Sequence, residues 1–94
     1  MGNEPQSDMW RLLNAVHPPA VLYTNQVAWL LGFRSHDISI LAGANILKPL
    51  GDPARNAPKR FATAAILRLR DNEEWLNKAV KVLAKHWKEK NSDE

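Results

Sequence analysis

The chain has 94 residues, enough for one small domain, and its 45% hydrophobic and 24% charged residues are typical of a folded protein rather than a disordered one. It contains no cysteine, which excludes disulfides, thiolate metal sites and cysteine nucleophiles, and it has no apolar run near the ~18 residues of a membrane span. The net charge is +3, and the excess lies between residues 47 and 70, where six cations accompany one acid. Residues 1–8 lack the pattern of a secretory signal, so we expect a cytoplasmic protein without membrane association.

The N-terminal region, residues 1–19, is predicted to be a tail followed by a short helix over residues 8–16. Met9, Leu12, Leu13 and Val16 fall on one face at helical spacing. The prolines at positions 18 and 19 end this helix, because the residue before a proline is pushed out of the helical region. A brief extended segment is expected next, over residues 20–23.

Two short helices are predicted between residues 24 and 43. Thr24 and Ser35 are good N-cap residues for them. Gly32 supplies the left-handed residue that ends the first helix, and the second should end near Gly43. Apolar residues at helical spacing give each helix one buried face, so the pair is predicted to form a helix-turn-helix through the sequence LGFRS.

The stretch LKPLGDPARNAPKRF, residues 47–61, is predicted to form a hairpin-like wing. Its flanks, ILKPL and KRFAT, are expected to be short extended segments, and the prolines, glycine and asparagine between them supply turn chemistry. Four cations lie in this stretch: Lys48, Arg55, Lys59 and Arg60. A local cluster of this kind favours an anionic partner more strongly than the total charge does.

The C-terminal region, residues 71–94, is predicted to be an amphipathic helix with a frayed tail. A short helix capped by Thr63 precedes it, and Asp71 or Asn72 should begin the long helix, which runs to about Lys88. Its apolar stripe consists of Leu76, Val80, Leu83 and Trp87. The stripe is predicted either to pack on the same chain or to form a homodimer, although a coiled coil this short is marginal alone.

Three stretches in residues 21–70, YTNQVAWLLGF, DISILAGANILKPLG and KRFATAAILRL, follow one another in an order that resembles a known family. They are similar to the winged helix-turn-helix of the excisionase and MerR-like DNA-binding proteins. The resemblance implies a mainly α fold, with a winged helix-turn-helix over residues 20–70, a short two-stranded wing and extra N-terminal and C-terminal helices. These parts together would make one compact domain.

The same resemblance implies which residues contact DNA. In this family the second helix enters the major groove, and the wing contacts the adjacent backbone or minor groove. By position, the residues near the groove are Arg34, Ser35, His36 and Ser39. The wing residues against the DNA backbone are Lys48, Arg55, Lys59 and Arg60.

The predicted function is therefore a small bacterial or phage-type DNA-binding protein, either a transcriptional regulator or an excisionase-like architectural factor, with double-stranded DNA as partner. The second helix carries Asp37 and no lysine or arginine after Arg34, which leaves an alternative open. The chain could be a protein-protein interaction module that keeps the winged-helix fold without binding DNA.

No enzyme, cofactor or metal site is expected from the sequence. It contains no recognisable Ser-His-acid motif and no phosphate-binding loop. The paired carboxylates Glu73 and Glu74 begin an exposed helix. The three histidines, His17, His36 and His86, lack the spacing of metal ligands.

Overall fold

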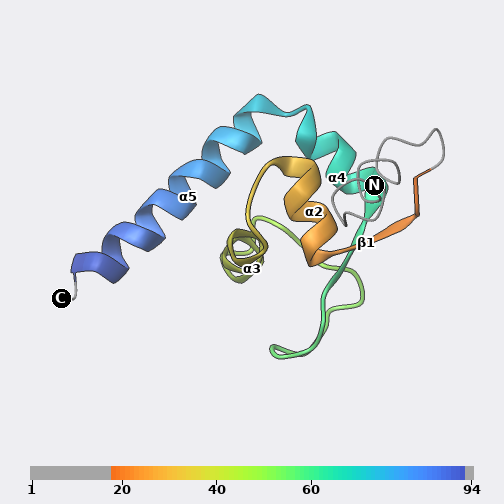
Figure 1. The fold of residues 1–94 in the computed structure, drawn as a ribbon, viewed down its shortest axis with the longest axis horizontal. Coiled ribbons are helices and arrows are strands. Elements are labelled where there is room, and N and C mark those ends of the chain that lie inside the picture. The colour runs from red at the N-terminus through yellow and green to blue at the C-terminus, as the bar shows by residue number, and fades with distance from the viewer. Residues whose placement is uncertain (1–17, 93–94) are drawn as a thin grey trace, which may run out of the picture.

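The structure is a computed structural model, and it describes residues 18–92. In this range the chain is mainly helical, with a small two-stranded antiparallel sheet (Figure 1). Its elements are β1 (Val21–Tyr23), α2 (Thr24–Leu31), α3 (Ser35–Gly43), β2 (Arg60–Ala62), α4 (Thr63–Arg70) and α5 (Glu73–Ser92). The helix predicted over residues 8–16 lies outside the described residues. None of the described helices is both long enough and apolar enough to cross a membrane.

Helices α2 and α3 each begin one residue earlier than the predicted caps require. Thr24 and Ser35 are the first helical residues, so their assignment as N-caps is wrong by one position. The N-cap residues are Tyr23 and Arg34, and the side chain three residues after each accepts a hydrogen bond from its backbone amide. Gln26 Oε1 accepts from the Tyr23 amide at 2.8 Å, and Asp37 Oδ2 accepts from the Arg34 amide at 3.0 Å. Asp37 therefore has a structural role at the start of α3.

The ends of both helices use left-handed residues. Gly32 has φ 82°, which confirms its predicted role after α2. After α3 the left-handed residue is Asn45, with φ 65°. The amides of Asn45 and Ile46 donate to the carbonyls of Ala42 and Leu41, respectively, in the pattern of a Schellman motif. This turn sends the chain away from α3 into the loop that precedes β2.

The sheet pairs two segments that are far apart in the sequence. Strand β1 runs antiparallel to β2 with Leu22 opposite Phe61, and both of these side chains are buried. The prediction that ILKPL and KRFAT form a two-stranded hairpin wing is wrong, because β2 pairs with β1 and residues 46–50 form no strand. Pro49 has no amide hydrogen to donate to a neighbouring strand. In β1, by contrast, exposed and buried residues alternate, and the central Leu22 is buried in the core.

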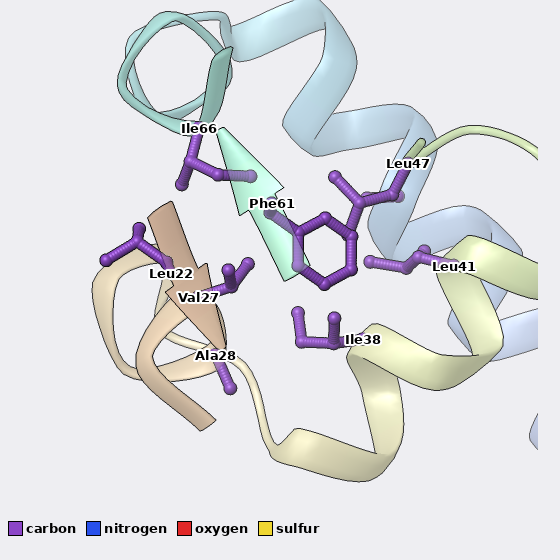
Figure 2. Packing of buried hydrophobic residues seen from close by; sticks show 9 residues of the cluster. Leu22, Val27, Ala28, Ile38, Leu41, Leu47, Phe61 and Ile66 are labelled. Carbon is purple, nitrogen blue, oxygen red and sulfur yellow. The ribbon is translucent and has the colours of Figure 1, made fainter. Parts of the chain in front are cut away.

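The core lies where α2, α3, α4 and the inner face of the sheet converge. Figure 2 shows the Phe61 ring among aliphatic side chains from α2, α3 and the loop that follows α3. The fully buried large side chains are Phe61, Leu22, Ile38, Leu41, Ile66 and Val27. Because each element contributes at least one of them, burial of apolar area holds β1, α2, α3, β2 and α4 in one body.

Thr63 joins the start of α4 to the segment before β1. It is buried, its hydroxyl donates to the Pro19 carbonyl, and its amide donates to the Ala20 carbonyl at 2.9 Å. Thr63 is the first residue of α4 rather than its N-cap, so its predicted capping role is also wrong by one position. Its side chain connects two parts of the chain that are distant in sequence.

The side chains of α5 that pack on the core lie between residues 75 and 83. Asn72 Oδ1 accepts a hydrogen bond from the Trp75 amide at 3.0 Å, which confirms Asn72 as a residue that starts the helix. The indole nitrogen of Trp75 donates to the Ile46 carbonyl at 2.9 Å, and Ala79 is fully buried. The helix continues past the predicted end at Lys88, and its C-terminal half extends away from the sheet in Figure 1.

Candidate nucleic-acid interface

The loop over residues 44–59, which we call the basic loop, is anchored at both ends. Leu47 is buried near its start, and the Leu50 amide donates to the Arg60 carbonyl at 2.7 Å, which closes its base. Gly51 and Asp52 both have positive φ, 74° and 47°, and reverse the chain before Pro53. Anchors and prolines together restrict the backbone that carries the cations.

A hollow of about 520 Å³ separates the basic loop from α3, and we call it the loop-side hollow. It brings together Ser39 of α3 with Arg55 and Lys59 of the loop. The lysine is positioned by a hydrogen bond from its Nζ to the Arg55 carbonyl at 3.3 Å. Asp52 also lines the hollow, so one negative charge partly offsets the two positive ones.

Arg60 lies elsewhere, on the outer face of the sheet. It is exposed and paired across the strands with Tyr23, and its guanidinium carbon is 5.6 Å from the centre of the Tyr23 ring. A second hollow, of about 420 Å³, connects Arg60 with Val21 and Leu50 rather than with α3. The four cations predicted for the wing are therefore divided, with Arg55 and Lys59 beside α3, Arg60 on the sheet, and Lys48 exposed near the loop's start.

The residues predicted near the groove are divided as well. Arg34 and His36 face α5, because they line a hollow together with Trp87. The His36 ring is 5.6 Å from the Trp87 ring and 6.5 Å from the His86 ring, centre to centre. One side of α3 is thus in contact with the C-terminal helix.

Another face of α3 remains open to solvent, and we call it the outward strip: Ser35, Ser39 and Gly43. These residues are exposed and recur every four positions, so they lie one above another on the helix. Ile38 and Leu41 occupy the buried side. Ser35 and Ser39 have small side chains and Gly43 has none, so a partner could approach the α3 backbone closely. The strip lacks the long polar side chains that read base edges at a distance.

The apolar stripe predicted on α5 is only partly covered. Leu76 and Leu83 are half-buried, whereas Val80 is 53% exposed and Trp87 is 37% exposed. The ammonium of Lys90 lies 5.2 Å from the centre of the Trp87 ring. The face of α5 that packs on the body is rotated from this stripe and consists of Trp75, Ala79, Val82 and Leu83.

The sequence favours packing for Trp75, but the predicted apolar stripe omits this residue, which anchors α5. A tryptophan that packs in the interior needs a hydrogen-bond acceptor for its indole nitrogen. That acceptor, the Ile46 carbonyl, lies just after the Schellman turn of α3 and could not be identified without the fold.

Within residues 18–92, no group of three or more His, Cys, Asp or Glu side chains is placed to hold a metal ion. The polar groups that the fold does bring together are the cations of Arg55 and Lys59 and the hydroxyl of Ser39, around the loop-side hollow. Comparison of the chain with protein-family models, with curated proteins and with solved structures gave no match.

Proposed function

We propose that this protein binds double-stranded DNA through the outward strip of α3 and the basic loop. The observation that carries the proposal is the loop-side hollow, where Arg55 and Lys59 stand beside Ser39. Guanidinium and ammonium groups bind phosphate oxygens, and a helix face of small side chains can enter the major groove. A cationic loop next to such a face suits a duplex better than it suits a small ligand.

The arrangement of elements supports a winged helix-turn-helix as the finer description of the fold. Helices α2 and α3 are joined by a short turn at Gly32, and the basic loop follows α3 in the position of a wing. By the resemblance noted in the sequence, the protein would be a transcriptional regulator or an excisionase-like architectural factor. No catalytic step is part of the proposal.

The proposed binding is mainly backbone contact. Arg55 and Lys59 would neutralise phosphates on one side of the groove and release counterions. Ser35 and Ser39 can each make one short hydrogen bond to a base edge or a phosphate. Affinity should therefore depend strongly on salt and only weakly on DNA sequence.

The test is a titration of a fluorescently labelled duplex with the protein at several salt concentrations, read by anisotropy. Arg55→Gln with Lys59→Gln should lower the affinity for every duplex alike and reduce the salt slope by about 2, because two phosphate contacts are removed. The matched control is Arg68→Gln with Arg70→Gln, which removes the same charge from exposed positions on α4. In Figure 1, α2 lies between α3 and α4, so the control residues are on a helix separated from the proposed interface.

Two results would contradict the proposal. Binding that is absent or independent of salt in the unaltered protein would remove its electrostatic basis. An equal loss of affinity in both double variants would show that net charge alone, and not the loop, sets the affinity.

A second candidate function is favoured by the exposed apolar residues on α5. Val80 and Trp87 leave an apolar surface open on a helix whose other face is packed, and such a surface is typical of protein contacts. A protein-interaction module that does not bind DNA would self-associate or bind a partner through this stripe. The molecular mass in solution, measured with and without duplex, separates the two functions.

A further inference from the structure

Three lysines form a row along α5. Lys78, Lys81 and Lys85 are all exposed, and their spacing of three and then four residues places them on one side of the helix. The row is roughly 10 Å long at the helical rise of 1.5 Å per residue. The acids of the first turn, Glu73 and Glu74, lie before it.

The last lysine of the row, Lys85, lies beside the C-terminal end of α3. A hollow of about 530 Å³, which we call the helix-side hollow, is lined by Ile40, Gly43 and Ala44 from α3 and by Val82, Lys85, His86 and Glu89 from α5. Lys85 is therefore directly across this hollow from the end of α3. Lys78 lies two turns earlier on the same line of the helix.

Gly43 lines both hollows, and this shared residue relates the two cationic groups to each other. On one side of Gly43 are Arg55 and Lys59 of the basic loop, and on the other is Lys85 of the row. In Figure 1, α3 is seen nearly end-on between α5 and the loop. The end of the outward strip, at Gly43, thus lies between the cations of the basic loop and Lys85 of the row.

We infer that the lysine row is a second phosphate-binding edge of the DNA interface, which contacts the strand opposite the one held by the basic loop. The inference rests on the proposed function and extends it to residues outside the wing and α3. The major groove is about 12 Å wide and has a phosphate backbone on each side, so an element that enters it meets phosphates on two edges. A row of roughly 10 Å matches about three phosphate steps of one strand at 3.4 Å each along the axis.

The charge around the row fits this role. Glu89 lines the helix-side hollow and reduces the potential there, but the positions between Glu74 and Glu89 on α5 carry no acid. Lysine suits a contact that needs a mobile point charge rather than a fixed fork, because its long stem can follow a phosphate. The row supplies affinity without sequence selectivity.

The experiment compares three double variants that each remove two positive charges. Lys78→Gln with Lys85→Gln tests the row, Arg55→Gln with Lys59→Gln tests the loop, and Arg68→Gln with Arg70→Gln is the control. Duplex affinity and its salt slope are measured by anisotropy, with circular dichroism to verify that helix content is unchanged. We expect the row variant to lose about tenfold or more in affinity and about 2 in salt slope, as the loop variant does, whereas the control changes little.

A charge-preserving variant gives a second readout. Lys78→Arg with Lys85→Arg should keep the salt slope of the unaltered protein, since the contacts to phosphate remain. Loss of binding in this variant would indicate a structural role for the lysine stems and would overturn the inference.

The outcomes separate this inference from the proposed function. If the loop variant loses affinity and the row variant behaves like the control, the second edge is wrong and the proposed function stands. If the unaltered protein shows no salt-dependent binding to the duplex, the proposed function itself is wrong. A preference for an RNA duplex of the same sequence would also overturn the inference, because the deep, narrow major groove of A-form RNA does not admit α3 between the two edges.

Discussion

The body around Phe61 and the helix α5 are held by different means. The body contains nearly all of the fully buried side chains, contributed by β1, α2, α3, β2 and α4. Helix α5 contributes one fully buried residue, Ala79, together with the hydrogen bond from Trp75 to the Ile46 carbonyl. The body is therefore a core that each element helps to enclose, whereas α5 is attached to its surface by a narrow strip.

This difference indicates where substitutions should be tolerated without loss of stability. A side chain in the body contacts several elements, so its replacement disturbs the whole core. Exposed positions of α5 such as Lys78, Val80 and Lys81 lie outside the core, so replacing them should cost little stability. The two features proposed for binding, the basic loop and the lysine row, both lie outside the core.

The largest expected effect is at the centre of the body. Phe61→Ala should lower the free energy of unfolding by about 3–5 kcal/mol, because it removes a fully buried ring and leaves a cavity. Urea denaturation followed by circular dichroism measures this. The control is Val21→Ala on the outer face of the same sheet, where an exposed side chain is shortened and a loss of less than about 1 kcal/mol is expected. Equal losses in both variants would contradict the assignment of inner and outer faces.

A smaller effect is expected where α5 is attached. Trp75→Phe removes the indole donor and leaves the Ile46 carbonyl without it, so the free energy of unfolding should fall by about 1–3 kcal/mol. Trp87→Phe makes the same chemical change at an exposed tryptophan on the same helix and should cost less than about 0.5 kcal/mol. If the two variants lose the same stability, Trp75 is not the anchor.

The smallest effect is expected on the open side of α5. Val80→Gln should change the free energy of unfolding by less than about 0.5 kcal/mol, since the side chain is 53% exposed. Sedimentation equilibrium on the same variant tests the possible homodimer. A dimer in the unaltered protein that dissociates in Val80→Gln would assign the stripe to self-association, and a monomer in both would argue against it.

The local parts of the fold were predictable because single residues specify them. Gly32 ends α2 by its left-handed conformation, and Asn72 begins α5 by accepting the Trp75 amide. The strand pairing was not predictable, because three-residue strands are too short to show a period and several segments have suitable composition. Leu22 pairs opposite Phe61 through burial in a core that only the whole fold defines.

The site was predictable in composition but not in arrangement. The sequence indicates that Arg55, Lys59 and Arg60 are close neighbours along the chain, yet alternation along β2 directs Arg60 to the outer face of the sheet. Similarly, α5 carries two overlapping apolar stripes. The sequence alone could not decide between them, because the position of Trp75 relative to the Ile46 carbonyl depends on how α5 crosses α3.

The pairing of β1 with β2 also has a consequence for how the protein reaches its native state. Everything between the strands, residues 24–59, must be brought into a closed loop before Leu22 can lie opposite Phe61. Closing a flexible segment of that length costs about 3 kcal/mol in chain entropy beyond a constant contribution. We therefore expect α2 and α3 to associate before the strands pair. The prolines after α3 should speed the closure, because they reduce the number of conformations open to the intervening chain.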